Sequence, residues 1–154
     1  MIEQKHFTQA LLDLLDETMD NVRGYYLDKG TSLFETLATI SAKEASIPVG
    51  SKCATLAAQV KHAAFYFYVI EMSVRNPNFP RADWGEIWRT VGAVNAAEWD
   101  AIRAELRASY VRIRALIQES PAWGEDEIGG ALGVLAHTAY HLGEIRQALC
   151  ILKP

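Results

Sequence analysis

Two histidines four residues apart, His137 and His141, lie in the apolar segment LAHTAYHLGEIRQAL. In a helix this spacing places both imidazoles on one face, one turn apart. A third histidine, His62, lies in a second apolar segment, AAQVKHAAFYFYVI. Neutral imidazole is a common ligand of divalent metals, so convergence of the three rings predicts a metal site with an open coordination position. The alternative is three core histidines that each hydrogen-bond to a neighbouring group.

Three polar residues near these histidines are candidates for supporting roles. Glu144 follows the histidine pair on the same helix face, which suits a fourth ligand, a general base or a group that orients an imidazole. An ion pair with Arg146 or another basic residue is the alternative. Tyr66, one turn after His62, can hydrogen-bond a water on the metal or pack in the core. Gln59, three residues before His62, can orient that imidazole.

Small residues precede the histidine pair on or near its helix face, namely Gly130, Gly133 and Ala136. Missing side chains there predict room for a ligand beside the metal, with the open face toward Gly133. Close approach of two helix backbones is the alternative explanation.

Helical periodicity dominates the chain, and no segment alternates as a strand does. Long helices are predicted over residues 6–27, 52–75, 96–119 and 125–152, with Ser51 as the N-cap of the second. The lengths are similar and the first two connections are long, which predicts an all-α four-helix bundle with crossover connections. With 154 residues, the whole chain 1–154 is expected to form one domain.

Several residue types are interpreted as structural. The charged side chains of two helices are expected to face solvent: Asp13, Asp16, Glu17 and Asp20 in the first, and Arg103, Arg107, Arg112 and Arg114 in the third. The four tryptophans are expected to be packing residues rather than a ligand cage: Trp84, Trp88, Trp99 and Trp123. Cys53 and Cys150 are expected to be buried, reduced thiols, with a lone disulfide between them as the alternative.

Composition limits the partners and the location. The formal net charge is −4 and the isoelectric point is about 5.5, which argues against nucleic acid because phosphate binding needs clustered Lys and Arg. No segment reaches the roughly 18 apolar residues that span a bilayer, and no secretory leader is evident. We therefore expect a cytoplasmic protein without a membrane partner.

The chain resembles the DinB-like superfamily of four-helix proteins, many of which carry a three-histidine metal site. The resemblance extends over nearly the whole length. It rests on H-x-x-x-H within AHTAYHLGEIRQAL, on the segment QVKHAAFYFYVI, on the pair Asp83-Trp84 before Trp88, and on the segment WDAIRAELRASY.

The resemblance implies that His62, His137 and His141 hold a divalent ion, with nickel and zinc both suitable. It also implies an up-down-down-up order of helices, which agrees with the long connections, and a homodimer. Relatives include S-transferases and isomerases that use low-molecular-weight thiols, and proteins described as hydrolases. The implied activity is that of an enzyme whose metal activates a thiol or water toward a small-molecule substrate.

Two other functions stay open from the sequence. One is a non-catalytic, metal-binding or stress-associated dimer that keeps the site for stability or sensing. The other is a purely structural dimer with three satisfied core histidines. The enzyme and these two alternatives are three hypotheses that differ in whether the protein binds metal and in whether an added thiol reaches the metal.

Overall fold

The computed structural model describes residues 3–51, 53–120 and 122–153, in which helices are the regular elements and no β-strand forms. The all-α class is therefore confirmed for this part of the chain. The long helices are α1 (Gln4–Met19), α4 (Leu56–Arg75), α6 (Ala96–Gln118) and α7 (Glu125–Leu152). Short helical segments lie in the connections: α2 (Leu33–Ala38), α3 (Ala42–Ala45), η1 (Val49–Ser51) and α5 (Glu86–Thr90).

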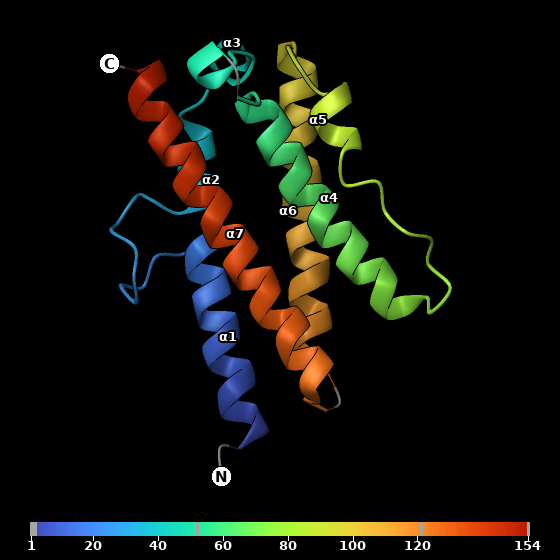
Figure 1. Cartoon of the computed structure of the whole chain (residues 1–154). Helices are drawn as coiled ribbons and strands as arrows, with labels where there is room; N and C mark the ends of the chain where they lie inside the picture. The colour runs from blue at the N-terminus through green and yellow to red at the C-terminus, as the bar shows by residue number, and fades with distance from the viewer. Residues whose placement is uncertain (1–2, 52, 121, 154) are drawn as a thin grey trace.

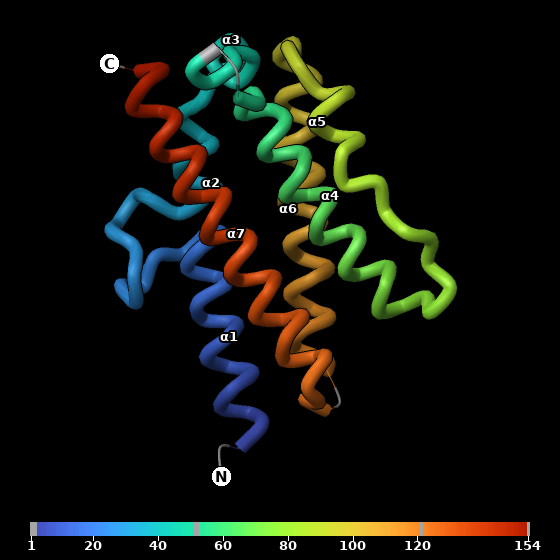
Figure 2. Tube along the Cα trace, viewed as in Figure 1, coloured from blue at the N-terminus to red at the C-terminus, as the bar shows by residue number. Residues whose placement is uncertain are grey.

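The long helices lie side by side, with α1 and α7 running in one direction and α4 and α6 in the other (Figures 1 and 2). Each of the pairs α1/α7, α7/α4, α4/α6 and α6/α1 is in contact, which encloses one core. Because α4 and α6 run in the same direction, their connection returns along the outside of α4 and carries α5. The core is apolar, with fully buried side chains from every long helix, including Leu15, Phe67, Leu106 and Ile145.

The first helix is shorter than predicted and ends at Met19 rather than near residue 27. The cause is Glu17, whose fully buried carboxylate accepts backbone N–H groups from the following segment at 2.7–2.9 Å. Burial alone would raise the pKa of Glu17, but these four hydrogen bonds lower it to about 2. The expectation that Glu17 is a solvated acid is wrong. The donors are Arg23, Tyr25, Tyr26 and Leu27.

Asp16 is also buried rather than solvated, and it ties α1 to α6. Its two carboxylate oxygens accept from Arg114 Nε at 2.8 Å and from Arg114 Nη2 at 3.0 Å, and Tyr110 donates to it as well. Arg112, also on α6, forms an ion pair with the buried Glu71 of α4 at 2.8 Å. The arginine face of α6 therefore holds neighbouring helices and is only partly solvated.

The predicted starts of the later helices have mixed outcomes. Helix α4 begins at Leu56, not at 52, because the Thr55 hydroxyl accepts the Ala58 N–H and acts as the N-cap in place of Ser51. Helices α6 and α7 agree with prediction to within one residue.

Two further observations concern expectations from composition. Cys53 and Cys150 are free thiols, but both are exposed, so their predicted burial is wrong. None of the helices in the described ranges combines the length and apolar character that crossing a bilayer needs.

Candidate metal centre

The structure brings together the three histidines singled out from the sequence. His62 extends from α4, and His137 and His141 extend from α7. The Nε2 atom of His137 lies 3.2 Å from that of His62 and 3.3 Å from that of His141. All three rings offer a nitrogen within 4.8 Å of the others. The predicted convergence is confirmed.

Both helices place these rings at the interior. Helix α4 is apolar on most sides. The small side chains of Ala63 and Ala64, next to His62, let this helix pack closely against the adjacent helices. His62 and His141 retain only 8% and 5% of their exposure, whereas His137 is half-buried. The polar rings therefore occupy positions where apolar side chains would ordinarily pack.

The two shortest separations between the nitrogens fit a tetrahedral metal site, and the third lies within 4.8 Å. Metal–imidazole bonds of about 2.0 to 2.1 Å with tetrahedral angles separate neighbouring ligand nitrogens by about 3.3 to 3.4 Å. The two observed separations, 3.2 and 3.3 Å, agree with that value. In contrast, hydrogen bonding alone cannot satisfy the cluster, because the single lone pair of His137 Nε2 accepts only one of its two neighbours.

The outer nitrogens of the rings are buried too. The Nδ1 atoms of all three histidines have no well-aligned hydrogen-bond partner among the described residues. Glu144 Oε2 does approach His141 Nδ1 to 3.0 Å, at ion-pair distance but outside hydrogen-bond alignment. Arg146 instead donates to Thr36 Oγ1 at 3.3 Å. Of the roles predicted for Glu144, orientation of His141 is the one that its position favours.

Electrostatics keep the imidazoles in the form that binds metal. Desolvation and the neighbouring rings of His141 and His62 lower the pKa of His137 to about 4. Desolvation and His62 do the same for His141, to about 4. Desolvation also lowers the pKa of His62, against the opposing charge of Glu144. The three rings are therefore neutral near pH 7 and their lone pairs are available.

Tyr66 packs against the cluster, as its alternative role predicts, whereas the surroundings of Gly133 and Gln59 differ from those predicted. The Tyr66 ring stacks on His137 with centroids 3.7 Å apart, and its hydroxyl lies 3.3 Å from where a Gly133 Cβ would be. The space beside Gly133 thus accommodates Tyr66, and the predicted open face there is wrong. Gln59 does not orient His62, since Gln59 Oε1 and His62 Nδ1 are both buried without a partner in the described ranges.

Two tryptophans from the connection between α4 and α6 line the outer side of the cluster. Trp88 packs on His62 with ring centroids 4.5 Å apart, and the Trp84 ring lies 6.3 Å from His62. They remain 41% and 40% exposed, so they form a wall that solvent reaches. Sequence reasoning assigned both to packing. Their spacing of one helical turn in a proline-containing connection is the signal that could have marked them.

Comparisons with protein-family models, with curated proteins and with solved structures return no match for this chain.

Proposed function

We propose that His62, His137 and His141 bind one divalent metal ion and that the protein is a metal-dependent enzyme of the DinB-like kind. The approach of three Nε2 atoms to 3.2 and 3.3 Å carries the proposal. Nickel and zinc both suit an all-imidazole donor set. The proposed architecture is an up-down-down-up four-helix bundle with crossover connections, and the direction of the four long helices supports it.

The ion would lower the pKa of a bound thiol or water and so supply a nucleophile near pH 7. The chain's own residues prepare for this. Burial keeps the three imidazoles neutral. Glu144 Oε2 lies 3.0 Å from His141 Nδ1, so a small reorientation lets the carboxylate accept a hydrogen bond from Nδ1–H, which leaves the lone pair of Nε2 free for the metal. The rings of Tyr66 and Trp88 shield the imidazoles from bulk water. A small-molecule substrate would enter past the exposed edges of the two tryptophans.

The proposal includes a homodimer in the cytoplasm. The aromatic side chain of Tyr68 on α4 is 41% exposed and suits a subunit interface. Light scattering on the purified protein measures the oligomeric state.

Elemental analysis of untagged protein, purified without chelator, tests the metal site. We expect about one nickel or zinc ion per chain in the wild type. His141→Ala should lose the ion, and His6→Ala should retain it because His6 is exposed in the first turn of α1 and is not one of the three grouped histidines. Absence of stoichiometric metal in the wild type, even after reconstitution, would overturn the proposal and favour three structural histidines.

A cobalt-substituted form then separates enzyme from binding protein. A thiol that joins the metal should change the visible absorption of cobalt, and turnover of an electrophile should require that thiol. A hydrolase should need only water and should lose rate in Glu144→Gln if Glu144 is the base. Bound metal with no spectral response and no turnover would support the non-catalytic alternative.

A further inference from the structure

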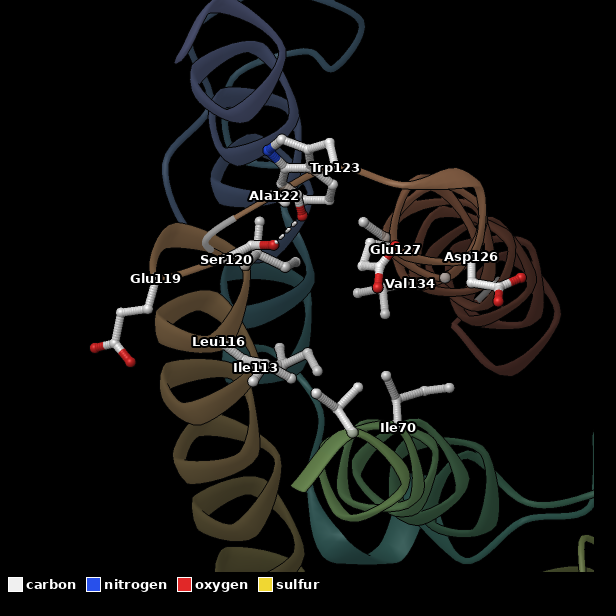
Figure 3. A pocket seen from close by; sticks show the side chains of 14 residues that line it. Ile70, Ile113, Leu116, Glu119, Ser120, Ala122, Trp123, Asp126, Glu127 and Val134 are labelled. Atoms are coloured by element: carbon white, nitrogen blue, oxygen red, sulfur yellow. Dashed lines mark hydrogen bonds between the residues drawn. The ribbon is translucent and has the colours of Figure 1, made fainter. Parts of the chain in front are cut away.

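A cavity lies away from the three histidines, between the C-terminal ends of α4 and α6 and the start of α7 (Figure 3). Its volume is about 470 Å³, within the range of small-molecule sites. None of the three histidines lines it, and it begins one helical turn beyond Tyr66 on α4, at Ile70. It is therefore separate from the candidate metal centre.

The floor and walls of this cavity are apolar. Ile113, Ile117 and Val134 are at most 5% exposed and form its deep part. Nearer the opening, Ile70 and Trp123 face each other across the space (Figure 3). The indole N–H of Trp123 already donates to Thr8 at 2.7 Å, so this ring is fixed and presents its apolar surface. Such a lining favours an alkyl or aryl body over a polar ligand.

The lining of the cavity includes one glycine. Gly130 lies beyond the first turn of α7 and lines the cavity. A Cβ added at this position would meet no atom within 4 Å. Glycine destabilises a helix interior relative to alanine, and here neither close packing nor a left-handed backbone requires it. The adjacent Gly129 has the same open surroundings but does not line the cavity.

The opening carries negative charge. Three carboxylates lie among the lining residues and no Lys or Arg does: Glu119, Asp126 and Glu127. None of them has an ion-pair partner within the described ranges. The Glu127 side chain lies on the cavity side of α7, whereas those of Asp126 and Glu119 extend away from it (Figure 3). A ligand head of positive charge would lie beside Glu127.

We propose that this cavity binds a cationic amphiphile, with the apolar body between α4, α6 and α7 and an ammonium group beside Glu127. The proposal does not rest on the metal centre, because no metal ligand lines the cavity.

Binding of octylamine, octanol and octanoate to the metal-free full chain tests this proposal, read by thermal unfolding and calorimetry. We expect octylamine to raise the melting temperature in a saturable manner. Its dissociation constant should be lower than that of octanoate by about tenfold or more, because attraction to Glu127 is replaced by repulsion. Glu127→Gln should bring the dissociation constants of octylamine and octanoate closer together, and octanol should still bind.

Gly130→Leu and Gly129→Leu form a matched pair. Both replace a helical glycine whose added Cβ would meet no atom within 4 Å, but only Gly130 lines the cavity, so only the first is expected to fill it. We expect Gly130→Leu to unfold at a higher temperature than the wild type and to lose the octylamine response, while Gly129→Leu keeps it. The proposal is overturned if no octyl compound binds saturably, if octanoate binds best, or if Gly130→Leu binds octylamine as the wild type does. A rise in melting temperature by octylamine that weakens as protein concentration increases would overturn it in favour of a second copy covering this face.

Discussion

His62→Leu should separate the stability of the metal-free chain from its metal binding. His62 is 8% exposed, packs on Trp88, and buries an Nδ1 atom that has no partner in the described ranges. A buried polar atom without a partner destabilises a fold by about 1 to 3 kcal/mol. Leucine keeps an apolar contact with Trp88, and His141 remains available to hydrogen-bond His137. The substitution therefore removes a penalty without leaving a new unpaired group.

In the presence of chelator, we expect the free energy of unfolding of His62→Leu to exceed that of the wild type by about 1 to 3 kcal/mol. For a domain of this size, that corresponds to an increase in melting temperature of roughly 2 to 12 °C. With metal at about 1,000 times its dissociation constant, the wild type should gain about 4 kcal/mol, and the variant should gain nothing. The order of stability should thus reverse between the two conditions.

Urea unfolding of wild type, His62→Leu and the exposed control His6→Leu, each with chelator and with metal, measures both effects. His6→Leu should behave as the wild type in both conditions. Lower stability of His62→Leu in chelator would refute the reasoning from the unpaired Nδ1 atom. Stoichiometric metal in His62→Leu would refute the assignment of His62 as a ligand.

Three further outcomes are expected. In the folded chain the pKa of His137 and of His141 is lowered from 6.5 to about 4, so between these pH values the unfolded chain binds more protons than the folded chain. The free energy of unfolding of the metal-free wild type, measured by urea titration, should therefore decrease as pH falls from about 6.5 to about 4. A flat profile across this window would contradict the burial of neutral rings. Glu144→Gln should weaken metal affinity by about 10- to 100-fold in competition with a chromophoric chelator, and unchanged affinity would remove Glu144 from the site. Asp16→Asn should lower the free energy of unfolding by about 1 to 3 kcal/mol, because one amide oxygen replaces only part of the charge-assisted hydrogen bonds that the carboxylate accepts from the partly exposed Arg114; an unchanged free energy would show that this pair adds little.

The candidate site was predictable because its ligands obey the helix period. Two histidines four residues apart in an apolar helix share a face whatever the tertiary context, and a third in another apolar helix must also face the interior. Trp84 and Trp88 could not be placed in this way. Their position depends on where a long connection lies against α4, which local periodicity does not encode.

The helix ends were the least predictable part of the fold, for a related reason. The apolar stripe of the first helix extends past Met19, but the Glu17 carboxylate binds backbone N–H groups from residues up to Leu27 and holds them outside the helix. Asp16 likewise looks like a surface acid until Arg114 approaches from α6. The partner of Asp16 is 98 residues away in sequence, and Glu17 binds backbone groups beyond its own helix, so the burial of both side chains emerges only in the folded chain.

The parallel course of α4 and α6 has a consequence for how this protein can diverge. The ligands lie on rigid helices, whereas the outer wall is carried by the connection 76–95, which must return along α4. Insertions and substitutions in such a connection leave the helical core intact. Selectivity for what reaches the three histidines can therefore change through this one segment, while the cluster and the stability of the fold are inherited unaltered.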